Sequence, residues 1–217
     1  RFRNLRNILA EDESQTTKMY VIDSPVLTNG MYQRFMDLEK NSHRTIDCTF
    51  EVPKPGDVPG DALKRTLTRI KDEAEAAVAD GIENIVLTDE FQSETKASTP
   101  LILAVGGVQQ RLVRKGLRSS CSIIVRSAEC LDTHYFAVLI GAGATAVNAY
   151  LSQDSLTDRV NRGLLDMSVD EAIARYKKAI EQGLLKIISK MGISVISSYR
   201  GGNNFEALGL SRAMVGR

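Results

Sequence analysis

From residue 45 onward the chain alternates short β-prone runs with longer segments whose apolar residues recur at helical spacing. The β-prone runs lie at 45–52, 85–87, 122–125 and 145–148, and the helical patterns lie at 61–80, 101–114, 131–140 and 169–182. Successive strand and helix pairs form βα units, which build a parallel sheet through right-handed crossovers. The sequence therefore predicts an α/β fold made of repeated βα units.

Residues that favour helix ends lie at the borders of these segments. Asp61 and Ser168 are placed to cap helices, Pro100 is placed to begin one, and Gly81 and Gly116 follow the ends of two others. The stretch 149–167 between the last strand and Ser168 has no comparable pattern, and we interpret it as a loop.

Four or five βα units fit either an open sheet or part of a barrel, and periodicity does not separate these two architectures. The run at 139–148, LIGAGATAVN, resembles the helix-to-strand turn that recurs in flavin-binding (β/α)₈ barrels. We therefore favour a partial, barrel-like arrangement with a parallel sheet. Residues 1–44 are expected to form an N-terminal arm with short helices, including one at 31–38, and residues 45–217 the α/β domain.

Composition excludes several classes of protein. The 28 basic and 27 acidic residues leave a net charge of +1, which predicts no bulk attraction to nucleic acid or to an anionic membrane. No apolar run approaches the roughly 20 residues that span a bilayer, and the N-terminus lacks the apolar core of a signal peptide, so we expect a cytoplasmic protein. The three cysteines, Cys48, Cys121 and Cys130, have neither disulfide nor metal-ligand spacing, and no metal site is expected.

The segment 183–210 changes period three times within a short length. Its pattern predicts a helix that ends near Gly192, a strand at 193–196, a loop at 197–204 and a helix at 205–210. The loop holds the residues that we regard as the best candidates for an interdomain or ligand contact: Tyr199, Arg200, Gly201, Gly202 and Asn203. An arginine can pair with a carboxylate or a phosphate, and the glycines allow close approach of another backbone.

Residues 186–215, KIISKMGISVISSYRGGNNFEALGLSRAMV, closely resemble the segment of the glutamate synthase large subunit that leads from its central domain into its FMN-binding domain. The stretches 21–29 and 112–118 support the resemblance, which extends over most of the chain. It implies a non-catalytic central domain, most similar to the bacterial NADPH-dependent form, with 183–217 leading toward the flavin domain. A start without methionine and a stop just after a helical pattern are also what we expect of a piece of a longer protein.

The resemblance also implies the setting of such a domain. A glutamate synthase serves ammonia assimilation and glutamate biosynthesis: it hydrolyses glutamine, passes ammonia through an internal tunnel and reduces 2-iminoglutarate at FMN. The expected partners are the glutaminase and FMN-binding domains of the same chain and a small reductase subunit. FMN and an iron-sulfur cluster would belong to other parts of that enzyme, so no cofactor and no activity are expected in this piece alone.

The alternative is a stand-alone flavin or phosphate-ligand enzyme with a barrel fold. Its site would use Asp89, which follows a strand as catalytic acids do in barrels, together with Arg126 and His134. Such an enzyme needs a phosphate-holding turn after a strand, whereas the glycines at 141–144 precede one and are typical of a tight αβ turn. A docking module without chemistry is a third possibility.

Overall fold

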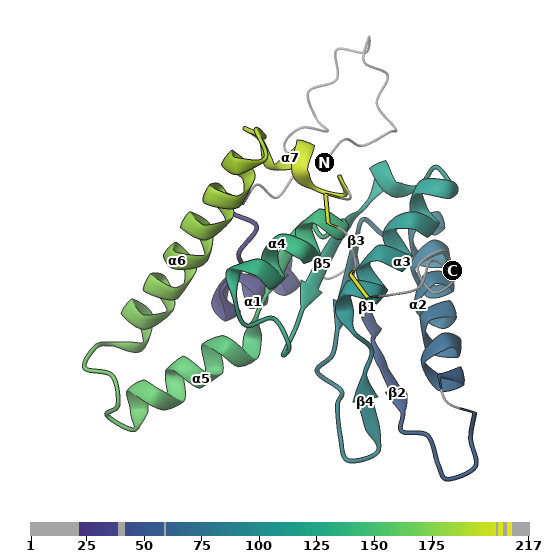
Figure 1. Cartoon of the computed structure of the whole chain (residues 1–217), viewed down its shortest axis with the longest axis horizontal. Helices are drawn as coiled ribbons and strands as arrows, with labels where there is room; N and C mark the ends of the chain where they lie inside the picture. Colours follow the sequence, from purple (N-terminus) through teal and green to yellow (C-terminus); the bar gives the residue numbers. More distant parts are fainter. Residues whose placement is uncertain (1–21, 39–41, 59, 203, 206–207, 210–217) are drawn as a thin grey trace.

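The computed structural model describes residues 22–38, 42–58, 60–202, 204–205 and 208–209 (Figure 1). The helix suggested by the apolar residues at 5–9 lies outside this part of the chain, as do Asn203 and most of the helix predicted at 205–210. In the described chain no helix is both long enough and apolar enough to cross a membrane.

The centre of the molecule is a four-stranded parallel sheet in the order β1-β3-β5-β6. These strands are β1 (His43–Asp47), β3 (Asn84–Thr88), β5 (Ser122–Arg126) and β6 (Ala146–Asn148). The register pairs Thr88 with Arg126 and Arg126 with Asn148, so that the carboxyl ends of three strands meet at one edge. The α/β class and the parallel sheet predicted from the sequence are confirmed.

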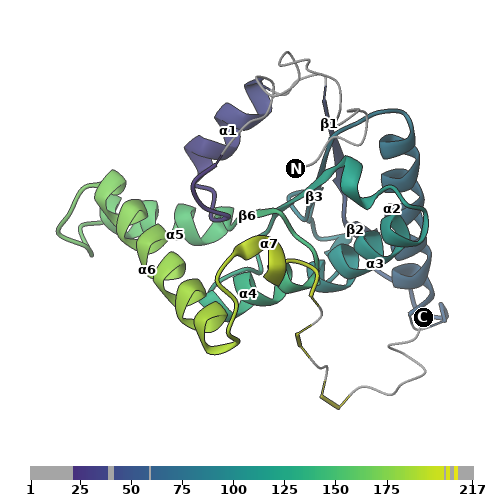
Figure 2. The same ribbon diagram turned by 90° about the horizontal axis from the view of Figure 1, so that it is seen from above.

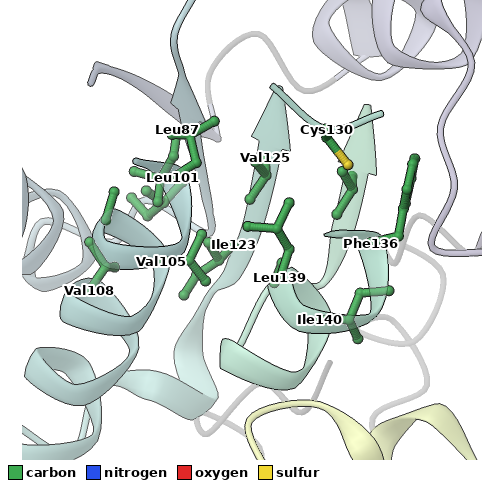
Figure 3. Packing of buried hydrophobic residues seen from close by; sticks show 14 of the residues in the cluster. Leu87, Leu101, Val105, Val108, Ile123, Val125, Cys130, Phe136, Leu139 and Ile140 are labelled. Carbon is green, nitrogen blue, oxygen red and sulfur yellow. The ribbon is translucent and has the colours of Figure 1, made fainter. Parts of the chain in front are cut away.

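Three helices cover one face of the sheet: α2 (Asp61–Ala79), α3 (Leu101–Arg114) and α4 (Thr133–Ala142). Alternate strand residues, including Leu87, Ile123 and Val125, point toward these helices and form the main core (Figure 3). The predicted helix at 61–80 is present, but Asp61 is not its cap. Gly60 occupies that position with a φ of 84°, which an L-residue rarely adopts.

The opposite face of the sheet is covered by α1 (Asn29–Leu38), which lies within the predicted N-terminal arm. Its Tyr32 and Phe35 pack with Val86, Ile124 and Ala146, the strand residues that alternate with those of the main core. The chain just before α1 extends the sheet, because the Leu27 amide donates to the Val147 carbonyl oxygen at 2.9 Å. Residues 22–38 of the predicted arm are thus packed against the α/β body.

Helices α5 (Tyr150–Asn161) and α6 (Val169–Lys190) pack against each other and extend to one side of the sheet (Figures 1 and 2). The prediction of a loop at 149–167 was wrong, because α5 occupies most of it. Its apolar residues form no strong stripe, and Gln153 is its buried residue. The Ser168 side chain caps α6 as predicted, and α6 continues through Gly183 where the sequence had suggested two helices.

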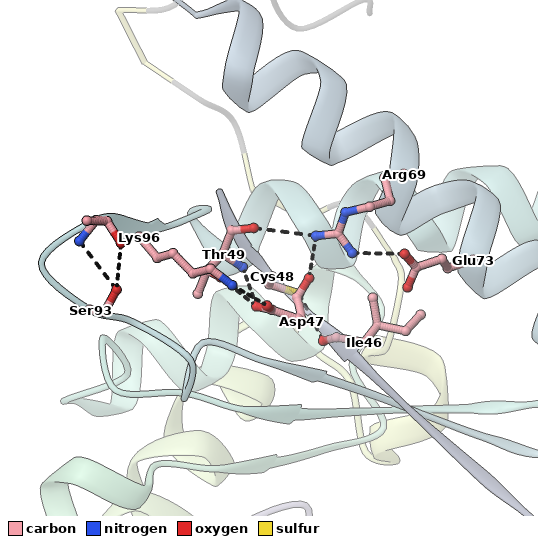
Figure 4. A network of polar contacts seen from close by, with 9 residues as sticks. Ile46, Asp47, Cys48, Thr49, Arg69, Glu73, Ser93 and Lys96 are labelled. Carbon is pink, nitrogen blue, oxygen red and sulfur yellow. Dashed lines mark hydrogen bonds and ion pairs between the residues drawn. The ribbon is translucent and has the colours of Figure 1, made fainter. Parts of the chain in front are cut away.

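The predicted strand at 45–52 is broken at Cys48 into β1 and β2 (Thr49–Glu51). Strand β2 pairs with β4 (Lys96–Ser98) in an antiparallel ribbon that the sequence did not reveal. Arg69 of α2 holds the junction: its Nη2 donates to the carbonyl oxygens of Asp47 at 2.7 Å and Thr49 at 3.4 Å, and its Nη1 pairs with Glu73 (Figure 4).

The end of the described chain differs most from its prediction. The strand expected at 193–196 is absent, and the short helix α7 (Ile196–Tyr199) occupies residues that had been assigned to that strand and to a loop. No strand of the parallel sheet pairs with this segment, so its β-branched residues have no ladder to join. Phe205, Leu208 and Gly209, the described residues of the last predicted helix, are not helical.

Candidate functional site

The predicted site residues lie at opposite ends of the sheet. Asp89 and Arg126 lie where the parallel strands end, which is the usual place for a site in a barrel-like fold. Arg200 and Gly201 lie against the carboxyl end of α4, near the end of the sheet where the strands begin. We describe the first group as the carboxyl-edge cluster and the second as the Arg200 turn.

Arg126 is the centre of the carboxyl-edge cluster. Its Nε lies 2.6 Å from a carboxylate oxygen of Glu90, and its Nη1 donates to Asn148 Oδ1 at 2.5 Å. The guanidinium carbon also lies 4.6 Å from the ring centre of Tyr32 and 4.7 Å from that of Tyr150. Such ion-pair and cation–π contacts hold the Arg126 side chain in place and engage its Nε and Nη1 groups.

The Asp89 carboxylate is fully buried beside Arg126. Its two oxygens accept the Ala128 amide at 3.0 and 2.9 Å, and the Tyr150 hydroxyl donates to it as well. Burial raises the pKa of Asp89 above its ordinary value, while the bond from Ala128 opposes that shift. Burial likewise raises the pKa of Tyr32 to about 12, so this phenol holds its proton at neutral pH.

A third carboxylate, Glu129, serves the architecture at the same edge. Its Oε1 accepts the Leu101 amide at 2.6 Å and so satisfies a free N–H group in the first turn of α3. The sequence did not single out Glu129 in this role, because the two residues are 28 positions apart and no local capping motif joins them. Asn148, Tyr32 and Tyr150 were missed for the same reason.

His134 does not join this cluster. It lies exposed in the first turn of α4, and its ring packs edge-on against Phe205 with 5.9 Å between the ring centres. Arg126 forms an ion pair with Glu90 and a cation–π contact with Tyr150, and the Tyr150 hydroxyl donates to Asp89. Among the described residues, none of these contacts includes His134. The three residues of the rival enzyme hypothesis therefore do not form a common constellation.

The Arg200 turn is fixed to α4 by its neighbours. The buried Tyr199 hydroxyl donates to the Ala137 carbonyl oxygen at 2.8 Å, and the Gly201 amide donates to that of Ile140 at 3.1 Å. Gly201 has a φ of 70°, and a Cβ there would lie 2.8 Å from the side-chain Nε2 of Gln109. The glycine permits this close approach, and the turn is a packed part of the domain.

Arg200 itself is half-buried, and burial lowers its pKa from the ordinary value. Arg118 is close enough that the charge of Arg200 also lowers the Arg118 pKa, after the larger effect of burial. Arg118 donates to the carbonyl oxygens of Cys121 and Gly143 at 2.7 and 2.8 Å. In the described ranges, no hydrogen bond or ion pair joins the Arg200 guanidinium to another side chain.

Side chains of the protein itself occupy the space beside Gly141 and Gly143 in the 141–144 turn. A Cβ at Gly141 would lie 2.7 Å from the Phe205 ring, and one at Gly143 would lie 2.5 Å from Gln109. This turn is a close packing site between α4, Gln109 and Phe205. Within the described ranges no group of three or more His, Cys, Asp or Glu residues is arranged to hold a metal ion.

Comparisons with known proteins agree on one family. A sequence model described as the glutamate synthase central domain matches residues 1–211. The Azospirillum brasilense glutamate synthase [NADPH] large chain is 52% identical over 216 residues, which are 99% of this chain and 14% of that one. The corresponding Bacillus subtilis large chain is 38% identical over 220 residues, and these cover 99% of this chain and 13% of that one.

This chain thus spans about one seventh of the length of these relatives. Among solved structures, a mutant flavocytochrome b2 with pyruvate bound superposes with a TM-score of 0.53 at 11% identity, covering 86% of this chain and 55% of that one. At that identity the similarity concerns the fold alone.

Proposed function

This chain belongs to the glutamate synthase central domain family, and from that premise we propose that it is the non-catalytic linking domain of a glutamate synthase large chain. In this role it separates a glutaminase site from an FMN-dependent synthase site and contributes to the wall of the tunnel that carries ammonia between them. The whole enzyme would convert glutamine, 2-oxoglutarate and a reductant into two molecules of glutamate.

The observation that carries the non-catalytic part of this proposal is that the charged residues of the carboxyl-edge cluster are held in contacts with one another and with the backbone. Arg126 is engaged by Glu90, Asn148 and two aromatic rings, and the Asp89 carboxylate is buried under its own hydrogen bonds. A catalytic acid, base or anion binder needs a free atom that can reach the substrate. The rival flavin or phosphate-ligand enzyme is not better supported, because Asp89 and Arg126 are engaged within the fold and His134 lies apart from them.

The physical need for such a domain follows from the chemistry of ammonia. Ammonia released into water is protonated and diffuses away, so transfer between two sites requires a shielded path and a rigid body around it. A parallel sheet covered on both faces provides that rigidity.

We further propose that the Arg200 turn faces a neighbouring domain, where the Arg200 guanidinium pairs with a carboxylate of that domain. The partners would be the glutaminase and FMN-binding domains of the same polypeptide, with a small reductase subunit elsewhere in a cytoplasmic enzyme. FMN and an iron-sulfur cluster would be held by those other parts, and residues 1–44 would act as the connecting arm.

The purified chain of 217 residues tests the proposal directly. We expect no glutamine hydrolysis and no 2-oxoglutarate amination above background, and a colourless protein without flavin absorbance. Turnover in either assay would overturn the non-catalytic assignment. A yellow protein that loses its colour when Arg126 is changed would favour the barrel-enzyme hypothesis. An Arg200→Ala variant of the intact large chain should release more ammonia per glutamate formed than the parent, with Arg175→Ala on an exposed face of α6 as the control.

A further inference from the structure

Large apolar side chains are exposed around the carboxyl end of the sheet. Each lies in the connection between a parallel strand and the next helix or in the first turn of that helix, and each is between 45% and 63% exposed. They are Val52, Val58, Phe91, Leu103, Leu131 and Leu151. Because parallel strands all end at one edge, these connections share one end of the molecule, which we call the carboxyl face.

Single exposed apolar residues are ordinary, but a group gathered at one end of a fold marks an interaction surface. Beneath this surface, Arg126 is ion-paired with Glu90 and the Asp89 carboxylate accepts the Ala128 amide. The carboxyl face therefore offers apolar contact area over a cluster whose main charged groups, Arg126 and Asp89, are held within the fold. This composition suits a protein surface better than a small polar ligand.

The charged side chains of the same loops are mostly acidic. The exposed acidic residues of these connections and first turns are Glu51, Asp57, Asp61, Glu90, Glu94 and Asp132, and the exposed basic residues are Lys54 and Lys64. Glu90 is already paired with Arg126. The chain as a whole is nearly neutral, so this acidic rim is a local feature. A complementary partner would carry Lys and Arg around an apolar centre.

The loops of the carboxyl face are held in place before any partner binds. The Val52 amide donates to the Thr95 carbonyl oxygen at 2.9 Å, Glu129 holds the start of α3, and Asp89 holds the loop after β5. An interface that is already ordered loses less conformational entropy on association. The Arg69 junction similarly fixes the start of β2 in the ribbon of β2 and β4 (Figure 4). Val52 directly follows β2.

We propose that the carboxyl face is the docking surface for an apolar, basic-rimmed face of another domain of the same large chain. The proposal rests on the linking function, and it names the face by which this domain holds one of its neighbours. A second copy of this chain is a poorer occupant, because it would place acidic rim against acidic rim. The relatives have most of their length outside the matched region, so their polypeptides have ample surface to supply the partner face.

Amide hydrogen exchange compares the intact large chain with the isolated chain of 217 residues and needs no substitution. We expect exchange in loops 89–95 and 127–132 to be at least roughly tenfold slower in the intact protein. Equal rates in both proteins would overturn the proposal. Slowing in the isolated chain that grows with its own concentration would also overturn it, because that result identifies a second copy as the occupant.

Variants of the intact large chain give the second measurement. Phe91→Asp and Glu94→Lys should each restore fast exchange in these loops, because one removes apolar contact and the other reverses a rim charge. Val113→Asp and Asp80→Lys make the same changes near the opposite end of the helices and should leave the loops protected. Equal effects of both pairs would reject the carboxyl face as a specific surface. Unprotected loops in an enzyme that still couples glutamine hydrolysis to glutamate formation would reject the docking proposal and leave the linking function standing.

Discussion

The Arg126 guanidinium combines an ion pair with Glu90, a hydrogen bond to Asn148 and two aromatic contacts, with a side chain that is only 17% exposed. Removing it leaves a partly buried carboxylate without its cation and two rings without their neighbour. Substitution of Arg126 therefore destabilises the folded protein through the loss of several contacts together.

We predict that Arg126→Met lowers the free energy of unfolding by about 2 to 4 kcal/mol, as for other broken ion pairs of low exposure. Arg175→Met is the control, because its ion pair with Glu171 is exposed and should contribute less than about 0.5 kcal/mol. Urea denaturation at pH 7 measures both variants. A loss for Arg126→Met as small as that of the control would contradict a structural role for the cluster.

Asp89 gives a prediction about pH. Because burial raises its pKa in the folded state, the folded protein holds this proton more tightly than the unfolded chain does. The resulting stabilisation is complete below the ordinary aspartate pKa of about 3.9 and is lost as the pH rises through the raised value. The unfolding free energy of the parent minus that of Asp89→Asn should therefore be largest near the acid end and decrease toward neutral pH. A difference that stays flat across this range would show that Asp89 has an ordinary pKa.

At the scale of elements, two glycines inside helices have opposite roles. A Cβ at Gly183 of α6 would lie 2.4 Å from Thr133 Cγ2, at the contact between α6 and α4. A Cβ at Gly106 of α3 would meet nothing within 4 Å. Gly183 therefore permits two helices to approach, whereas Gly106 only lowers the helix propensity of its own element.

We predict that Gly183→Ala destabilises the protein by about 1 to 3 kcal/mol, because the added methyl group must push α6 away from Thr133. Gly106→Ala should instead stabilise it by about 0.5 to 1 kcal/mol through helix propensity. Thermal unfolding by circular dichroism compares the two variants with the parent. Two shifts of the same sign would refute this assignment of the glycines.

At the scale of the whole molecule, the sheet is closed on one face by three helices and on the other by α1. The second layer depends on contacts between residues that are far apart in sequence, since Phe35 packs with Ile124 and Leu27 bonds to Val147. We therefore expect α1 to unfold together with the sheet. The proposed boundary at residue 44 then marks a change of pattern in the chain within one cooperative unit.

We predict that Phe35→Asp lowers the stability of the entire sheet by about 4 kcal/mol or more, because it places a charge in an apolar layer. Leu38→Asp on the same helix is the control, since Leu38 is 67% exposed and its change should stay within about 0.5 kcal/mol. Unfolding followed by both far-ultraviolet circular dichroism and tyrosine fluorescence should give coincident transitions. Separate transitions would mean that α1 is an independent arm.

The sequence itself determined the elements whose signals are local. The helix at Leu101–Arg114 agrees with its prediction because Pro100 begins it and a regular apolar stripe continues through it, and the strands of the parallel sheet were marked by short β-branched runs. The Ser168 cap and the tight turn at Gly143 needed only neighbours within a few positions. Family membership was also visible, because a resemblance is carried by consecutive residues.

Tertiary structure decided the features that depend on distant residues. The segment at Ile193–Ile196 has β-prone residues but no strand to pair with, while α5 is a helix despite its weak apolar pattern because it packs against α6. The sequence predicted only part of the carboxyl-edge cluster: Asp89 and Arg126 were candidates, whereas Tyr32 and Asn148 were not. Hydrogen bonds, ion pairs and apolar burial between segments more than a hundred residues apart leave no periodic trace in a sequence, so only the folded chain shows which side chains are already paired and which surfaces are still open.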